Sequence, residues 1–170
     1  TEMKVGHVPE DRHRDGLVLD MMISENIALQ TYYKEPLSKN GILNYPNITS
    51  YAKKLMDEFD VRAASEVVPA KALSGGNQQK VVLGRWLMTE PKILLLDEPT
   101  RGIDVGAKAE IYQLINNLAK QGMAIIVVSS ELPEVIGISD RIVTFCEGEL
   151  TGEYLQEEAT QEKLLQSATK

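Results

Sequence analysis

Two short, uninterrupted apolar runs constrain the fold of this chain more than any other feature. They are Ile93–Leu96 and Ala124–Val128. Continuous apolar strands, unlike alternating ones, are typical of parallel sheets that are covered on both faces. Between the runs, apolar residues recur at helical spacing and stop near Gly122, which indicates a helix. Strand, helix and strand within about 35 residues form a βαβ crossover, so the sequence predicts an α/β fold with a parallel sheet.

Further elements are expected on both sides of this crossover. Ser24 is a candidate cap for a short helix through Leu29, and residues 34–45 are expected to form a surface loop. The remaining expectations are strands over Lys4–Val8, Arg141–Cys146 and Leu150–Tyr154, and helices over 48–59, 81–87 and 160–168. The chain therefore divides into a largely helical lobe (about 15–90), an α/β lobe (about 1–14 and 91–154) and a terminal helix (about 160–168).

A Gly-Gly turn at the start of the helix over 81–87 is suited to bind phosphate. Ser74 precedes Gly75 and Gly76, and the amides of Asn77 and Gln78 follow. Such a turn offers backbone N–H groups, the positive end of a helix dipole and a hydroxyl group. Because the N–H groups must approach a phosphate closely, Gly76→Asp is expected to abolish function without unfolding the chain. The alternative interpretation is a capped helix start that binds no ligand.

A second motif lies at the end of the first apolar run. Asp97 and Glu98 follow Leu96 directly, and open α/β sheets place their ligands at the carboxyl ends of strands. A nucleotide bound with Mg²⁺ needs a metal ligand and a base at such a position. The alternative interpretation is a solvent-exposed acidic turn before Pro99.

Charge and cysteine content exclude several classes of protein. The net charge of −7, from 18 Lys and Arg against 25 Asp and Glu, argues against nucleic acid as a partner, since phosphate backbones require a basic surface. Apolar runs are too short for a membrane-spanning helix, and no secretory signal is evident. Cys146 is the single cysteine, which fits a reducing cytoplasm and a buried, inert thiol.

The two motifs, in this order and spacing, resemble the signature loop and the Walker B strand of ATP-binding-cassette (ABC) ATPases. Four segments narrow the resemblance to the second nucleotide-binding domain of bacterial importers for monosaccharides of the ribose, galactose and xylose type. They are Val8–Arg12, Leu73–Lys80, Asp97–Lys108 and Ser129–Val135. The resemblance covers residues 4 to about 168 and implies a partial P-loop NTPase core of the ABC type, with a parallel sheet and a helical subdomain.

The resemblance implies roles for the residues of the two motifs. Ser74, Gly75 and Gly76, with Asn77 and Gln78 behind them, contact the γ-phosphate of ATP that the partner cassette holds. Asn77 stands where Gln is commoner in the family. Asp97 holds Mg²⁺, and Glu98 polarises the water that attacks the γ-phosphate.

Three further residues have implied roles in the loops around the nucleotide. Asp104 belongs to the D-loop at the interface between two cassettes, and it is also a candidate N-cap for the helix through Ala107. Glu10 occupies the position of the Q-loop Gln, and Ser130 the position of the switch His. Serine is shorter than histidine and cannot carry its charge, so these two replacements put hydrolysis at this site in doubt.

The loop that cradles the phosphates in P-loop NTPases does not occur in this chain. That loop has the pattern G-x-x-x-x-G-K-[ST], and no glycine here is followed five positions later by Gly-Lys. In the family it lies upstream of the signature loop, so the chain resembles the later part of a nucleotide-binding domain. On its own, the chain is expected to be inactive.

The function implied by the resemblance is the coupling of ATP hydrolysis to carbohydrate uptake, with ATP and Mg²⁺ as cofactors. The expected partners are the first cassette of the same protein or a second copy, a sugar permease in the inner membrane and, indirectly, a periplasmic sugar-binding protein. The expected location is the cytoplasmic face of the bacterial inner membrane.

Two alternatives stay open at this point. One is a non-hydrolysing regulatory cassette, which Glu10 and Ser130 favour. The other is a DNA-maintenance ATPase head, which is disfavoured because the sequence shows none of the heptads of its long coiled coils. The identity of the sugar is not encoded here, because the resemblance places specificity in the permease and the binding protein.

Overall fold

The computed structural model describes residues 4–169 and divides the chain into two compact units, Thr1–Ile126 and Val127–Lys170. The first unit contains the whole of the expected helical lobe and most of the expected α/β lobe. The helix over Gly75–Leu87 contacts elements of both lobes and so joins them in one unit. The lobe boundaries expected from the sequence therefore differ from this division and stay a prediction.

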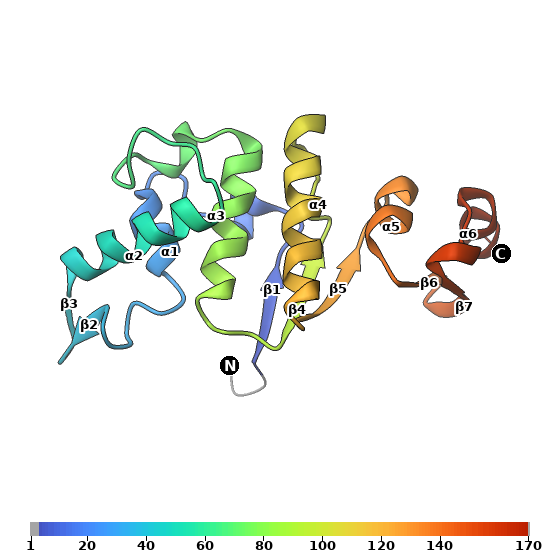
Figure 1. Cartoon of the computed structure of the whole chain (residues 1–170), viewed down its shortest axis with the longest axis horizontal. Helices are drawn as coiled ribbons and strands as arrows, with labels where there is room; N and C mark the ends of the chain where they lie inside the picture. Colours follow the sequence, from blue (N-terminus) through green and yellow to red (C-terminus); the bar gives the residue numbers. More distant parts are fainter. Residues whose placement is uncertain (1–3, 170) are drawn as a thin grey trace. The chain divides into compact units, whose positions relative to one another are not determined.

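A three-stranded sheet lies in the first unit, apart from the last two residues of its third strand, which belong to the second unit. Its order is β1 (Val5–Val8), β4 (Ile93–Asp97) and β5 (Ala124–Val128), and Figure 1 shows β1 beside β4. The strands β1 and β4 run parallel, with Val5 opposite Ile93 and Val8 opposite Leu96. The expected α/β class with a parallel sheet is confirmed.

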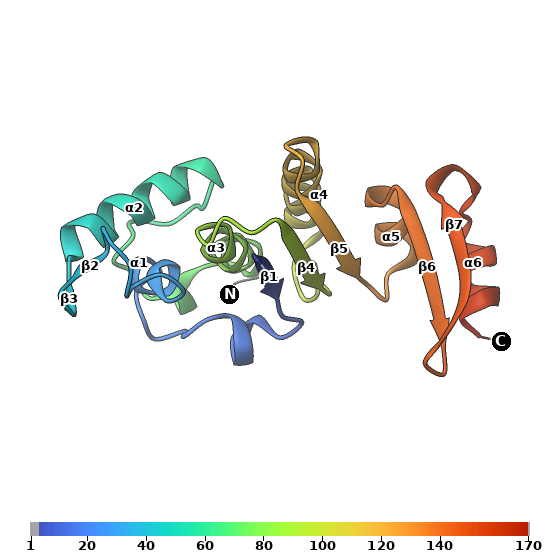
Figure 2. The ribbon, with the colours of Figure 1, turned by 90° about the horizontal axis from the view of Figure 1, so that it is seen from below.

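The helices of the first unit are α1 (Ile23–Ala28), α2 (Tyr45–Glu58), α3 (Gly75–Leu87) and α4 (Val105–Lys120), with short helical turns over Arg12–Gly16 (η1) and Ala70–Ala72 (η2). The central helix is α3, which contacts α1, β1, α4 and η1; Figures 1 and 2 show it between α1 and the sheet. Its residues Val81, Val82 and Leu83 are fully buried. Each such side chain contributes about 1.5–3 kcal/mol through the hydrophobic effect.

The sheet is covered less completely than the continuous apolar runs predict. Figure 2 shows α3 and α4 on the same side of β1 and β4. Buried and half-buried residues alternate along β4, whereas Ala124, Ile126 and Val128 of β5 are exposed, Ile126 by 55%. The expectation that both runs are covered on both faces is therefore wrong for β5 within the described residues.

The start of α1 also differs from the sequence-based expectation. The helix begins at Ile23, after Met22, and Ser24 is a buried residue inside it. The Glu25 carboxylate accepts a hydrogen bond of 2.9 Å from the Met22 N–H, and the Ser24 N–H donates to the Glu66 carbonyl. A cap at Ser24 was wrong because the chain reaches its helical bonds two residues earlier.

The expected surface loop over 34–45 contains a small hairpin. Its strands are β2 (Ser38–Lys39) and β3 (Ile42–Leu43), joined by Asn40 and Gly41, both with positive φ. Leu37 is buried against Ala28 and Ile48, which fixes the hairpin to α1 and α2. Turn residues thus signalled a hairpin here rather than an unstructured loop.

The second unit is built on the hairpin of β6 (Arg141–Cys146) and β7 (Glu149–Leu155). Glu147 and Gly148 have φ of 48° and 85°, as a two-residue type I′ turn requires. The helices α5 (Leu132–Ile138) and α6 (Gln161–Ala168), with the turn η3 (Gln156–Glu158), complete the unit. Ile142, Ala159 and Leu164 form its core. The expected strands and terminal helix are confirmed, but Cys146 is half-buried rather than buried.

None of the helices within residues 4–169 is long and apolar enough to cross a lipid bilayer.

A buried lysine joins α3 to α4. Lys80 is 4% exposed, and its Nζ donates to the Asp60 carbonyl at 2.8 Å and pairs with Glu110 Oε2 at 2.7 Å. Arg62 also pairs with Glu110, at 3.2 Å. The hydrogen bond from Lys80 lowers the pKa of Glu110, so this stabilisation is present at neutral pH and is lost as the pH falls through the lowered pKa.

Replacing Glu110 with Gln is therefore expected to destabilise the first unit. The variant removes the nearer of two carboxylates from the buried Lys80 ammonium, since Asp60 Oδ2 lies 3.6 Å away and Glu110 Oε2 2.7 Å, and the expected cost is about 1–3 kcal/mol. The matched control is Asp20→Asn, which removes a carboxylate at the same 2.7 Å from Lys71, a side chain that is 60% exposed. Urea unfolding followed by fluorescence of Trp86, the single Trp, which lies on α3, should show a loss for Glu110→Gln and none for Asp20→Asn. Equal losses would contradict the role of Lys80.

Candidate functional site

The two adjacent carboxylates lie at the carboxyl edge of the sheet. Asp97 is the last residue of β4, Glu98 follows it, and both are half-buried. The neighbouring parallel strand β1 ends at Val8, so Pro9 and Glu10 leave the sheet at the same edge. Ligands of open α/β sheets bind at this edge.

The backbone at Glu98 takes a conformation that glutamate rarely adopts. Its φ is 45°, in the left-handed region. The Arg101 N–H donates to the Glu98 carbonyl at 3.0 Å, which closes a turn through Pro99 and the buried Thr100. A left-handed non-glycine residue costs about 1–3 kcal/mol and is concentrated at functional sites. The turn therefore holds the Glu98 side chain in a direction that a relaxed backbone would not give it.

Glu10 is tied to the same turn from the other strand. Its carboxylate forms an ion pair with the guanidinium of Arg101, and both side chains are about half exposed, 47% and 63%. The expected Q-loop residue thus lies against the segment that follows Glu98. Among the predicted site residues, the structure brings Glu10 and the 97–104 segment together.

The predicted signature loop begins α3. Ser74 occupies the N-cap position and is exposed, but its side chain makes no capping hydrogen bond to the helix. Its Oγ instead accepts a hydrogen bond of 2.8 Å from Asn77 Nδ2. The first N–H groups of α3 are therefore not capped by this hydroxyl, and they carry the positive end of the helix dipole.

The orientation of the Asn77 amide follows from its second partner. The backbone N–H of Arg62, which can only donate, bonds to Asn77 Oδ1 at 2.8 Å. The amide nitrogen must then be the atom that faces Ser74. Because the Ser74 oxygen accepts, its own hydrogen remains to be donated to another acceptor. This arrangement makes Ser74 a hydrogen-bond donor beside a helix N terminus, which suits a phosphate oxygen.

The two glycines bring the N termini of α3 and α4 into contact. A Cβ added to Gly76 would lie 2.4 Å from the Ala107 Cβ, and one added to Gly75 would lie 3.2 Å from the Gly102 carbonyl oxygen. Gly76 is buried. The expectation that Gly76→Asp leaves the fold intact is therefore wrong, since the position faces α4 inside the unit.

Asp104 caps α4. Its Oδ1 accepts a hydrogen bond of 2.9 Å from the Ala107 N–H, as the N-cap interpretation predicts. The residue is exposed, and Val105 after it is 84% exposed. The predicted role of Asp104 at an interface between cassettes stays a prediction.

Arg12 is a residue of the site that sequence reasoning missed. Its guanidinium donates to the carbonyls of Arg101 at 2.7 Å and Gly102 at 3.2 Å, and to Gln78 Oε1 at 3.3 Å. Gln78, expected to bind the nucleotide, is only 6% exposed, and its amide is taken up by Arg12, by His13 at 2.9 Å and by the Ala70 carbonyl. Burial lowers the pKa of Arg12 from its usual value. Arg12 is the last residue of the segment Val8–Arg12 that carries the family resemblance, but nothing in the charged loop 10–16 indicates which residues it bonds.

Ser130 lies in the second unit, in the exposed segment before α5. The neighbouring Ser129 hydroxyl donates to the carboxylate of the buried Glu134 and accepts from the Glu131 N–H at 3.0 Å. These bonds fix the turn on which Ser130 is carried. Its predicted role as a switch residue stays a prediction.

The donor set at the end of β4 fits Mg²⁺. No group of three His, Cys, Asp or Glu side chains that could hold a metal ion occurs within residues 4–169. Magnesium bound to nucleotides takes only one or two carboxylates from the protein and the rest of its ligands from phosphate and water. Asp97, with Glu98 beside it, supplies such a carboxylate at the carboxyl edge of the sheet.

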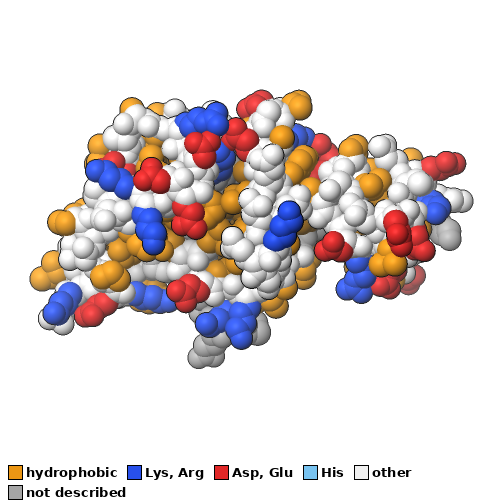
Figure 3. Space-filling model, viewed as in Figure 1, with side chains coloured by type: hydrophobic (Ala, Val, Ile, Leu, Met, Phe, Trp, Pro, Cys, Tyr) orange, Lys and Arg blue, Asp and Glu red, His pale blue; other side chains and the backbone are white. Residues whose placement is uncertain are grey.

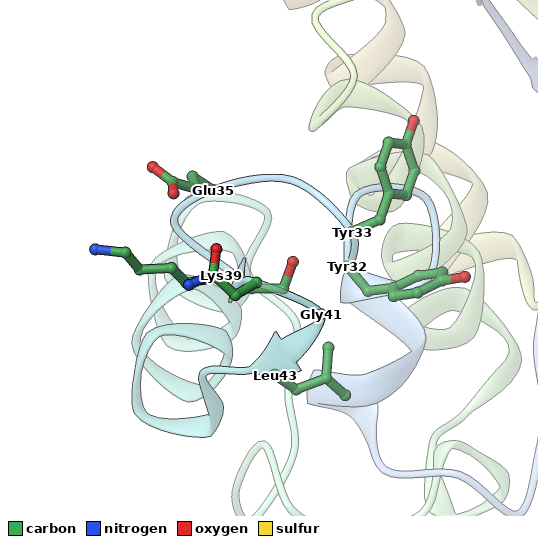
Figure 4. Close-up of a pocket in the computed structure, with 8 residues that line it drawn as sticks. Tyr32, Tyr33, Glu35, Lys39, Gly41 and Leu43 are labelled. Carbon is green, nitrogen blue, oxygen red and sulfur yellow. The ribbon is translucent and has the colours of Figure 1, made fainter.

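A cavity of about 530 Å³ in the first unit lies apart from these residues. Figure 4 shows that it is lined by the hairpin β2–β3 and by Tyr32 and Tyr33, whose rings pack edge to face. Figure 3 shows hydrophobic surface over the same hairpin and the start of α2, to which the more than half-exposed Ile42 and Tyr45 belong. None of the predicted site residues lines this cavity.

Comparison with known proteins places this arrangement in a family. The family model described as "ABC transporter" matches residues 1–101. The chain is 51% identical over 164 residues to a nucleoside import ATP-binding protein of Lactococcus lactis subsp. cremoris, covering 96% of this chain and 32% of that protein. It is 56% identical over 162 residues to a xylose import ATP-binding protein of Moorella thermoacetica, covering 95% of this chain and 32% of that protein. The chain thus spans about a third of the length of the curated relatives that it matches.

A solved structure supports the fold. The chain superposes with a TM-score of 0.72 on a dimeric ATP-binding cassette in a post-hydrolysis state with ADP and Pi, covering 89% of this chain and 62% of that one. At 24% identity this likeness shows the fold alone.

The contact between Gly76 and Ala107 has room for one methyl group, on either residue, but not for two. Gly76→Ala is expected to lower the free energy of unfolding by about 1–3 kcal/mol, because overpacking shifts backbone. Ala107→Gly alone should cost about 1 kcal/mol in helix propensity. The double variant restores the original number of methyl groups at the contact. Its loss of unfolding free energy should therefore be smaller than the sum of the losses of the two single variants. Additive losses, measured by urea unfolding with Trp86 fluorescence, would refute the contact.

Proposed function

The chain belongs to the ABC transporter family, and we propose that it is the later part of a nucleotide-binding domain that couples ATP hydrolysis to carbohydrate uptake. The proposal rests first on the N terminus of α3, where Ser74 is exposed. There the Ser74 hydroxyl is held as a donor beside uncapped helix N–H groups. A phosphate is the ligand that this arrangement fits best.

The signature loop acts on a nucleotide held by another cassette. We assign the N–H groups of Gly75 and Gly76 and the Ser74 hydroxyl to its γ-phosphate. The Asn77 amide orients Ser74 rather than binding phosphate itself, and the buried Gln78 positions Arg12. The exposed Asp104 and Val105 then face the partner. The dimeric cassette to which the chain is similar in fold is consistent with such a pairing.

The carboxylates serve the nucleotide of this domain. Asp97 would hold Mg²⁺, which when bound neutralises phosphate charge and orients the γ-phosphate. Glu98, aimed by its left-handed backbone, accepts a proton from, or orients, the attacking water. Residues 1–170 contain no G-x-x-x-x-G-K pattern, so the phosphates of this site are held by residues outside them. We therefore propose that residues 1–170 do not hydrolyse ATP on their own.

Two relatives support a proposal for the substrate class. One is a xylose import ATP-binding protein and the other a nucleoside import ATP-binding protein, and both substrates carry a pentose. We propose that a permease in the bacterial inner membrane and, outside it, a periplasmic binding protein select the sugar, while this domain works on the cytoplasmic face. The first cassette of the same protein or a second copy is its partner.

A second candidate function is a regulatory cassette that binds but does not hydrolyse ATP. The ion pair of Glu10 with Arg101 favours it, because the carboxylate at the Q-loop position is already engaged within the chain. Ser130, at the switch position, supports the same alternative.

The variant Glu98→Gln in the complete transporter distinguishes the two functions. The amide cannot accept a proton, so hydrolysis at this site should slow by about 10²–10⁴-fold while ATP binding persists. Glu147→Gln is the matched control, since Glu147 has nearly the same φ, 48° against 45°, at an exposed turn. Steady-state ATPase and nucleotide-binding assays measure both effects. Total ATPase activity unchanged by Glu98→Gln would reject the hydrolytic site and leave the regulatory cassette.

A further inference from the structure

The guanidinium of Arg12 joins three segments that are distant in the sequence. Arg12 itself lies in η1, just after β1, while its acceptors are the carbonyls of Arg101 and Gly102 and the side-chain oxygen of Gln78 on α3. The acceptors are 66 to 90 residues away. Arg12 thus meets the start of the signature helix and the loop that ends at Asp104.

The geometry requires arginine. A guanidinium has five N–H donors in a rigid, planar fork, whereas a lysine ammonium offers a single point of attachment. Nη1 reaches the Arg101 carbonyl at 2.7 Å and Nη2 the Gly102 carbonyl at 3.2 Å. Both of these successive carbonyls face the Arg12 side chain at the point where Gly102 takes a left-handed φ of 68°. The fork therefore fits one shape of this loop.

Gly75 makes room for the same group. A Cβ at Gly75 would lie 3.0 Å from Arg12 Nη2 and 3.2 Å from the Gly102 carbonyl oxygen. The first residue of α3 is therefore packed directly on the bond between Arg12 and the loop. A glycine in the signature loop thus serves a contact within the chain as well as the approach of a phosphate.

The Gln78 side chain fixes the position of the Arg12 guanidinium. Its Nε2 donates to the Ala70 carbonyl at 3.2 Å, so Oε1 is the atom that faces Arg12 and His13. His13 then donates from Nε2 to the same oxygen at 2.9 Å. The turn η1 is capped by Asp11, which accepts from the N–H groups of His13 and Arg14, and these bonds lower the pKa of Asp11.

We propose that Arg12 is the positioning residue that holds the loop 101–104 in register with the N terminus of α3, so that the segment after β1, the signature loop and the D-loop move as one body. The consequence for the rate rests on the proposed function. When the segment after β1 shifts, Ser74 and Asp104 shift with it.

Hydrogen exchange of the protein tests the positioning directly. In Arg12→Lys the peptide over 98–104 is expected to exchange about tenfold faster, because bonds from a charged donor to its carbonyls are lost. The N terminus of α3 should loosen with it, while α2 and the core of α4 keep their protection. Arg14→Lys is the matched control, since Arg14 lies in the same turn, is 82% exposed and pairs only weakly, at 3.9 Å, with Asp15. Equal exchange in the two variants would overturn the proposal, as would uniform loosening of residues 4–169.

The complete transporter provides a second readout. Arg12→Lys should lower the kcat of ATP hydrolysis by about tenfold and change the KM for ATP less than twofold, because positioning acts on the closed state rather than on nucleotide binding. Arg14→Lys should change neither. An unchanged kcat in Arg12→Lys, despite faster exchange over 98–104, would overturn the link to catalysis. A transporter without any ATPase activity would instead reject the proposed function, and hydrogen exchange would still decide the role of Arg12.

Discussion

The close contact between the N termini of α3 and α4 is the constraint on which the rest of the first unit depends. Gly76 lies against Ala107 with no room for another methyl group, and Gly75 lies against Gly102. Because both helices start at this point, the signature loop and the Asp104 loop form one surface. Ser74, just before the two glycines, is exposed, and the Arg12 guanidinium packs against Gly75. The two glycines of the signature are therefore required by packing within the chain before any phosphate is considered.

Much of the fold could be predicted from apolar patterning and turn residues. Local patterns predicted the strands over Ile93–Leu96, Arg141–Cys146 and Leu150–Tyr154 and the helix over 160–168, and the structure confirms these elements. The start of α1 could not be read in this way, because it depends on bonds from Ser24 to the distant Glu66 carbonyl. The exposure of β5 was also missed, since periodicity does not show which faces the helices cover.

The same distinction between local signals and long-range contacts applies to the candidate site. Asp97 and Glu98 were found because they directly follow a strand, and Asp104 because a cap is a local pattern. The bonds of Arg12 reach residues as many as 90 positions away, so local patterns did not indicate its role. The left-handed backbone of Glu98 was missed as well, because glutamate rarely adopts it. Gln78 was assigned to the nucleotide from its place in the motif, whereas its side chain is buried and supports Arg12. Motif membership thus located the site but did not show the role of each residue in it.

Ser74 is proposed to serve a nucleotide held by another cassette. Thiol labelling of Ser74→Cys in the complete transporter, in a Cys146→Ser background, tests it most directly. A non-hydrolysable ATP analogue with Mg²⁺ should protect the new thiol. Protection should vanish when the phosphate-loop lysine of the partner cassette is replaced, and persist when the corresponding lysine of this domain is replaced. Protection that depends on the lysine of this domain instead, or no protection at all, would contradict the account.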